Sequence, residues 1–107
     1  MNTLNAPETE LKLISKIQSD VAEAHGFLVS SMTASSKRGA ARTCYTRARD
    51  VSIVLCKHLT KSSQASICNM HGLDERSFHH CHAAGMKIIK SDKRITRSLD
   101  NIIKKHS

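Results

Sequence analysis

Apolar residues recur near the start of the chain at steps of three and four, the spacing that places side chains on one face of an α-helix. This first stripe comprises Leu11, Ile14, Ile17, Val21 and Ala24. Pro7 precedes it as a first-turn residue, and Gly26 follows it as a terminator. The pattern predicts a leading helix over residues 7–26, after a disordered terminus at residues 1–6.

A polar, basic segment separates this helix from the next. Residues 30–46 include four serines and Gly39, and they contain no acidic residue. Serine and glycine clusters without apolar periodicity are typical of loops, so we predict a positively charged loop here. A second stripe follows, and its β-branched residues lack the strict alternation of a strand, which favours a helix. The stripe comprises Val51, Val54, Leu55 and Leu59.

The next segment has the order of a helix-turn-helix. Residues 60–63 offer three hydroxyl side chains that can cap a short helix, which ends at Gly72. Asp74 can cap a longer helix from about Glu75 to Lys90. A short helix, a glycine-containing turn and a longer helix define the motif, which we place at residues 62–90.

A final basic helix completes the pattern. Asp92 can cap it, and its inward-facing residues are Ile95, Leu99, Ile102 and Ile103. The sequence contains no βαβ alternation, internal repeat or glycine-rich phosphate loop. We therefore expect an all-α fold, a small helical bundle. One domain would span residues 7–107, with the helix-turn-helix and the C-terminal helix in residues 47–107.

Charge is distributed unevenly along the chain. Residues 1–25 carry two basic and four acidic side chains, whereas residues 26–107 carry fifteen basic and five acidic ones. The resulting excess of +10 favours a polyanionic partner such as nucleic acid, although a membrane surface would also attract it. No apolar run approaches a membrane-spanning length or resembles a secretion signal. We expect a cytoplasmic, nucleoid-associated protein without a membrane partner.

Cysteine and histidine residues raise two further hypotheses. The four cysteines at positions 44, 56, 68 and 81 would allow two disulfides, but reduced, partly buried thiols are favoured without an export signal. Thiolate and imidazole are ligands that zinc prefers. A zinc site is conceivable, but we favour no bound metal or other cofactor, because histidines beside phosphates need none. The four residues of the conceivable site are Cys68, His71, His79 and His82.

Several short stretches occur in a defined order between Ile14 and Ile103. They are Ile17-Gln18, Val21-Ala22-Glu23, Ser36-Lys37-Arg38, Arg47-Ala48-Arg49, Leu55-Cys56-Lys57-His58-Leu59-Thr60, Ser63, Ile67 and the residues 72–77. Together they resemble the C-terminal DNA-binding domain of the bacterial replication initiator DnaA, as a small stand-alone DnaA-like protein of alphaproteobacterial type. The resemblance implies a Trp-repressor-like helix-turn-helix. The initiator's ATPase portion has no counterpart, so we expect no ATP-driven strand opening from this chain alone.

The resemblance also implies roles for individual residues. An arginine of the family's basic loop enters the minor groove, and that role falls to Lys37, Arg38 or Arg42. Other family contacts come from the start and middle of the long helix and from the start of the short helix. The residues that inherit them are Arg47, Arg49, Lys57, Ser63 and Gln64.

We call the predicted helix from Glu75 to Lys90 the reading helix. The turn that leads into it departs from the family pattern. Asp74 stands where the family has an arginine, and Arg76 replaces a histidine, as in the small relatives. Arg76 suits bidentate contact with guanine, and Phe78 suits contact with a thymine methyl group. The docking mode survives these changes, whereas the preferred DNA sequence need not. The predicted reading residues are Glu75, Arg76, Ser77, Phe78 and His79.

These observations predict sequence-preferring binding of double-stranded DNA by a transcriptional or replication-associated regulator that acts by occupying its site. The alternative is a helical protein-interaction module derived from a DNA-binding domain, because Asp74 adds negative charge and an exposed Phe78 would also fit a protein pocket. RNA is disfavoured, since the chain holds only three aromatic residues for base stacking. Enzyme activity is not expected, because no nucleophile motif surrounds any cysteine.

Overall fold

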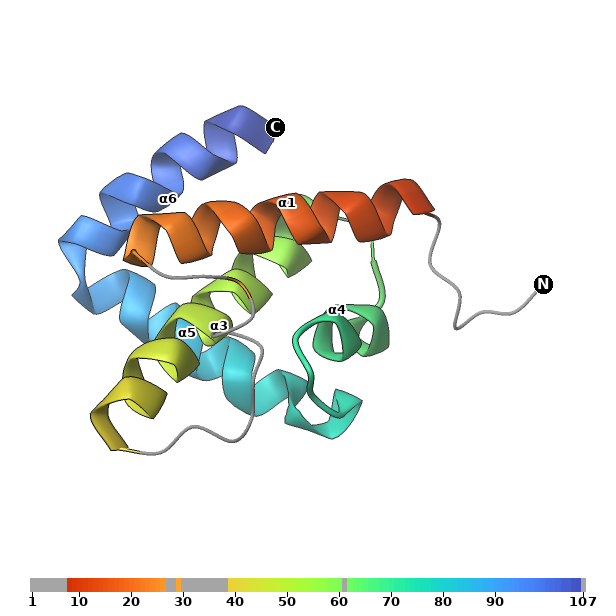
Figure 1. The fold of residues 1–107 in the computed structure, drawn as a ribbon, viewed down its shortest axis with the longest axis horizontal. Coiled ribbons are helices and arrows are strands. Elements are labelled where there is room, and N and C mark those ends of the chain that lie inside the picture. The colour runs from red at the N-terminus through yellow and green to blue at the C-terminus, as the bar shows by residue number, and fades with distance from the viewer. Residues whose placement is uncertain (1–7, 27–28, 30–38, 61, 107) are drawn as a thin grey trace.

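The computed structural model describes residues 8–26, 29, 39–60 and 62–106, and this part of the chain contains helices but no strands (Figure 1). The elements are α1 (Glu8–His25), α3 (Gly39–Leu59), α4 (Gln64–Met70), the short 3-10 helix η1 (Glu75–Ser77), α5 (Phe78–Ser91) and α6 (Lys93–His106). The predicted all-α class and small helical bundle are confirmed. None of the described helices has the length and apolar character needed to cross a membrane.

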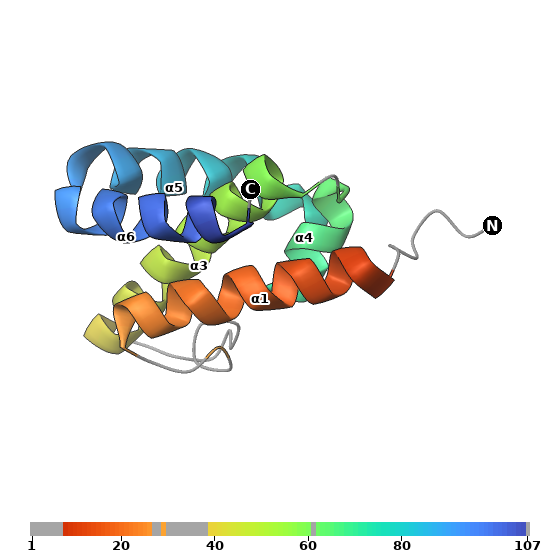
Figure 2. The same cartoon turned by 90° about the horizontal axis from the view of Figure 1, so that it is seen from above.

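α3 runs through the middle of the bundle, with α1 on one side and α5 and α6 on the other (Figure 2). Every residue from Asp50 to Cys56 is buried, so this part of α3 is enclosed all round. A helix enclosed by other elements needs no polar face. This explains why burial extends beyond the predicted stripe to Ile53 and Cys56.

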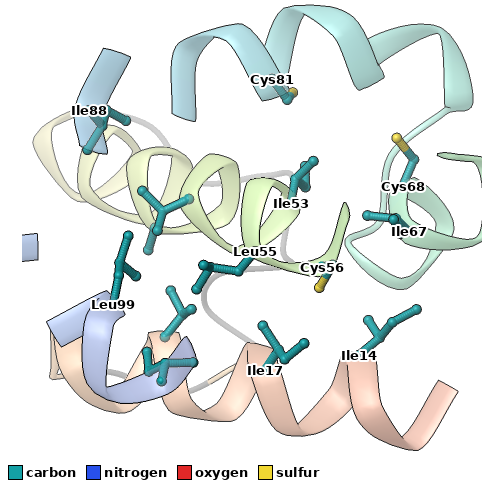
Figure 3. Close-up of a cluster of buried hydrophobic side chains, with 14 of the residues drawn as sticks. Ile14, Ile17, Ile53, Leu55, Cys56, Ile67, Cys68, Cys81, Ile88 and Leu99 are labelled. Atoms are coloured by element: carbon teal, nitrogen blue, oxygen red, sulfur yellow. The ribbon is translucent and has the colours of Figure 1, made fainter. Parts of the chain in front are cut away.

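The apolar stripes of α1, α5 and α6 meet α3 in one core (Figure 3). Ile14 and Ile17 approach from α1, and Cys81 and Ile88 approach from α5. Fully burying a side chain such as isoleucine contributes roughly 1.5–3 kcal/mol to stability. The inward faces predicted from the sequence for α1 and α6 are confirmed at Ile14, Ile17, Val21, Leu99 and Ile102, which are buried, whereas Ala24 at the end of the predicted α1 stripe is exposed.

α1 also fastens its neighbours through polar contacts. Gln18 donates a hydrogen bond from Nε2 to the Met70 carbonyl at the end of α4, at 2.7 Å. Further along, the Asp20 carboxylate accepts from Lys105 at 3.1 Å and from His106 at 2.6 Å. Burial alone would raise the pKa of Asp20, but these two donors hold it below its usual value. α1 is thereby tied to both α4 and α6.

Two predicted boundaries are wrong. The segment predicted as a loop over residues 30–46 is helical from Gly39 onward. Ala40 and Ala41 favour a helix without any apolar stripe, because alanine has the highest helix propensity. Residues 30–38, like the predicted disordered terminus, lie outside the described part of the chain. The reading helix does not start at Glu75, since a 3-10 turn precedes α5.

α5 crosses α3 at Gly85. A Cβ atom built at Gly85 would lie 2.4 Å from the Asp50 carbonyl oxygen and 2.7 Å from Val54 Cγ2. Both separations are far inside van der Waals contact, and one of the two atoms belongs to the backbone. Only glycine therefore lets α5 lie this close to α3, because it has no side chain to accommodate.

We predict that Gly85→Ala destabilises the fold, although alanine favours helices over glycine by about 1 kcal/mol. The added methyl group must push α5 away from the α3 backbone, and overpacking of this kind costs about 1–3 kcal/mol. Thermal unfolding followed by circular dichroism should show a lower midpoint. The matched control is Ala83→Gly on the exposed face of the same helix, which loses only helix propensity. A midpoint for Gly85→Ala at or above that of the unaltered protein would contradict the close packing.

Candidate nucleic-acid interface

α4, a turn and α5 follow one another in the order that the sequence predicts. Ser63 caps α4 with its side chain. At the other end Gly72 adopts a positive φ of 73°, and its N–H donates to the Asn69 carbonyl at 3.1 Å. The N–H of Leu73 donates to the Cys68 carbonyl at 2.9 Å, which completes a Schellman motif. The predicted end of the short helix at Gly72 is confirmed.

His71 fastens this turn to α3. The side chain is buried, and its Nδ1 donates to the Ile67 carbonyl at 2.7 Å. Because a carbonyl can only accept, Nδ1 carries the proton and Nε2 accepts from the Ser52 hydroxyl, also at 2.7 Å. Burial lowers the pKa of His71 to about 4. The ring is therefore neutral at pH 7 and holds the turn in a fixed position.

The four residues considered as zinc ligands do not converge. His71 uses both ring nitrogens in hydrogen bonds, and Cys68 is buried in the apolar core while His79 is exposed. Burial also raises the pKa of the Cys68 thiol, which disfavours a metal-binding thiolate. Among residues 8–26, 29, 39–60 and 62–106, no three histidine, cysteine or acidic side chains gather as metal ligands.

The described cysteines lie in the core as free thiols. Cys56, Cys68 and Cys81 are all buried and unpaired. Burial raises the pKa of Cys56 to about 12 and that of Cys81 to about 11. These thiols act as small apolar side chains in the core. The side chain of Cys44 lies outside the described part.

α5 buries one face and exposes the opposite one. Its buried residues are Phe78, Cys81, Gly85 and Ile88. The exposed residues recur at the same helical spacing, and α5 contains no acidic residue. We call this exposed set, together with the preceding Arg76, the α5 outer stripe. Its members are Arg76, His79, His80, Ala83, Lys87 and Lys90, and it does not include Ser91, the exposed last residue of α5.

Arg76 begins the α5 outer stripe with a side chain that is 89% exposed. Its guanidinium pairs with the Asp74 carboxylate at 3.1 Å. The backbone N–H of Arg76 also donates to Asp74, at 3.0 Å, and these contacts lower the pKa of Asp74. An ion pair in water is weak and is screened by salt. The guanidinium can therefore exchange Asp74 for another acceptor.

Two predicted contact residues are directed into the protein. Phe78 is only 4% exposed, and its ring stacks on that of His82 with a centroid distance of 5.4 Å. The prediction that Phe78 meets a thymine methyl group is wrong, because the side chain anchors the first turn of α5 in the core. Arg49 is mostly buried, pairs with Asp50 at 3.2 Å and reaches Cys81 Sγ at 3.6 Å. Its side chain joins α3 to α5, so only a small part of it is accessible for the predicted DNA contact.

Several other predicted contact residues border the turn. Glu75 and His79 are exposed on either side of Arg76, and Ser77 is half-buried there. At the start of α4, Ser63 is exposed and Gln64 is half-buried. Three predicted reading residues, Glu75, Ser77 and His79, thus flank Arg76 and are at least partly exposed.

The remaining predicted contacts are scattered. Lys57 is exposed near the end of α3, where it borders an apolar groove. Arg47 lines a cleft together with Arg94, beyond the end of α5 that is remote from Arg76. The residues of the predicted basic loop are not placed: Lys37 and Arg38 lie outside the described residues, and so does the side chain of Arg42, which belongs to α3.

A group of exposed cations lies at the corner between α5 and α6, where the sequence-based prediction named no contact. The single acidic residue of this corner, Asp92, caps α6 by accepting from the backbone N–H groups of Arg94 and Ile95. The signal is visible in the sequence as five basic residues within positions 87–97. We call this group the basic corner, and it comprises Lys87, Lys90, Lys93, Arg94 and Arg97.

We predict that His71 makes the fold sensitive to acid. The folded-state pKa of about 4 lies below the ordinary value of 6.5, so the stability is fully present above pH 6.5 and declines as the pH falls toward 4. The loss should reach about 2 kcal/mol at pH 5. Urea unfolding of the unaltered chain and of His71→Gln at pH 7.5 and 5 isolates this contribution, because all other titrating groups are shared. Equal pH dependence in both proteins would refute the assignment.

No protein-family model matches the chain, and no curated protein or solved structure matches it significantly. The similarity to the DnaA DNA-binding domain therefore stays a resemblance, which depends on the residues quoted above.

Proposed function

We propose that this chain binds double-stranded DNA through the α5 outer stripe and regulates transcription or replication by occupying its site. The observation that carries the proposal is the stripe itself, a helix face that is exposed along its length, lacks acidic residues and leads into the basic corner. The major groove of a duplex admits one α-helix. Cations beside that helix can neutralise phosphates and release counterions.

The two ends of the α5 outer stripe suit different contacts. Arg76, His79 and His80 at its start carry donors that can meet base edges. Lys87 and Lys90 follow about 12–16 Å further along the helix axis, as the helical rise dictates. With the first turns in the groove, these lysines are placed to contact phosphates, and such contacts fix orientation rather than sequence.

The support of the turn favours the same proposal. His71 bonds to Ser52 of α3, and Phe78 inserts into the core. The backbone that carries Arg76 is therefore held rigidly, whereas the Arg76 side chain is retained only by its exposed pair with Asp74. A rigid backbone that carries an exposed polar side chain is suited to a binding site, because the backbone loses little conformational entropy on binding.

We predict that the double variant Lys87→Gln/Lys90→Gln weakens binding to duplexes of every sequence. Each lost phosphate contact should reduce the slope of log affinity against log salt by about 0.9. Fluorescence anisotropy with a random-sequence duplex at several salt concentrations measures both quantities. Lys16→Gln, a substitution of an exposed lysine on α1, is the control and should change little. A flat salt response of the unaltered protein, or an equal loss in the control, would contradict the proposal.

We further predict that Arg76→Ala relaxes the base preference at one position while the salt slope changes little. The reason is that its guanidinium would contact a base edge, whereas the lysines would contact phosphates. Selection of bound duplexes from a random pool, performed with both proteins, gives the two preferences. Indistinguishable preferences would remove Arg76 from the reading residues.

A second candidate function is a protein-interaction module. Burial of Phe78 removes one argument for it, but an apolar groove of about 460 Å³ between α3, α5 and α6 favours it. Met86, Ile89 and Ile103 line this groove, and Lys57 borders it. Co-purification of nucleic acid that is released by salt supports the first function, whereas salt-insensitive retention of a defined protein partner supports the second.

A further inference from the structure

A cleft of about 300 Å³ lies where α1 ends and α6 begins, against the first half of α3. Its lining includes Val21 and Leu99, which are buried, and Ile95, which is half-buried. Arg47 of α3 and Arg94 of α6 line the same cleft and are both exposed. The cleft therefore combines an apolar interior with two guanidinium groups that come from different helices.

The two arginines differ from the others discussed above. Arg49 and Arg76 each pair with an acidic neighbour. The side chains of Arg47 and Arg94 form no hydrogen bond or ion pair within the described part of the chain. Unpaired guanidinium groups on the wall of one cleft are available to a ligand that accepts hydrogen bonds.

Other groups of the cleft add to its preference for an anion. Ser98 follows Arg94 by one helical turn and also lines the cleft. Asp92 lines it as well, but its carboxylate accepts hydrogen bonds from the backbone N–H groups of Arg94 and Ile95 at the start of α6. The positive end of the helix dipole offsets this negative charge.

We propose that this cleft binds a phosphate group, with Arg47 and Arg94 donating to its oxygens from two sides and Ser98 donating a further hydrogen bond. Guanidinium groups match phosphate geometry through paired N–H donors. A phosphate monoester has three non-bridging oxygens and a diester has two, and each of these oxygens can accept more than one hydrogen bond, which suits three donors from two helices. The phosphate belongs either to a small organic ligand, for which 300 Å³ is the lower end of the usual pocket size, or to the DNA backbone.

The cleft is distinct from the turn that carries Arg76. α5 has 14 residues and separates Arg76 from Arg94 by about 20 Å along its axis. Neither Arg47 nor Arg94 belongs to the α5 outer stripe. The phosphate site and the proposed reading of bases can therefore be tested by separate substitutions.

The first test titrates the full chain with phenyl phosphate and with inorganic phosphate, followed by NMR of backbone amides. For a small-ligand site we expect saturable shifts at the start of α6 and around Arg47. Arg47→Gln and Arg94→Gln should each weaken this binding by about tenfold, as expected for the loss of a charged hydrogen bond. Arg97→Gln, exposed on the same helix but outside the cleft, is the matched control and should bind both phosphate probes as tightly as the unaltered protein does.

The second test measures duplex affinity for the same three variants and separates the two sources of phosphate. If the DNA backbone occupies the cleft, Arg47→Gln and Arg94→Gln lower duplex affinity and its salt slope more than Arg97→Gln does. If a free ligand occupies it, only the phosphate probes respond. The proposal is overturned if neither probe nor duplex distinguishes the cleft variants from Arg97→Gln. Because Lys87 and Lys90 do not line the cleft, their double variant reports on the outer stripe independently.

Discussion

The arrangement of this protein depends on how closely α5 can approach α3. At Gly85 the two helices are so near that even a methyl group would collide with the Asp50 carbonyl. This approach determines which face of α5 enters the core, and Phe78, Cys81 and Ile88 follow Gly85 into it. The opposite face is then necessarily exposed. The α5 outer stripe is thus a direct consequence of one close contact between two helices.

A second constraint sets the position of the turn before α5. His71 bridges the end of α4 and the middle of α3 through two short hydrogen bonds. Neutral histidine is suited to this place because it has one donor and one acceptor on the same ring. The Schellman motif at Gly72 then directs the chain toward η1. Packing and hydrogen bonds together therefore fix the position of the turn that carries Arg76, without a bound partner.

Much of the fold follows from local sequence signals. Helical spacing gives the buried stripe of α1, and Gly26 and Gly72 end their helices with the positive φ angles that glycine allows. Asp92 caps α6 as predicted, whereas Asp74 caps the 3-10 helix η1 instead of the longer helix α5. The start of α3 was not predictable from apolar periodicity, since a polar helical turn has none.

The site was less predictable than the fold. Spacing shows which residues share a helix face, but it does not show which neighbour that face meets. We predicted that Phe78 and Arg49 contact DNA, yet the packing of α5 on α3 buries Phe78 and brings Cys81 against Arg49, which also pairs with Asp50 of its own helix. The basic corner was visible as a charge cluster, and its joint position with Arg47 required the tertiary structure.

Contact between the α5 outer stripe and duplex DNA can be mapped residue by residue through amide chemical shifts. The isotope-labelled 107-residue chain would be titrated with a random-sequence duplex at low salt. We expect the largest shifts at the exposed positions from Arg76 to Lys90, and we expect these shifts to vanish as salt is added. Shifts concentrated on α1, or no shifts at saturating duplex, would contradict this contact.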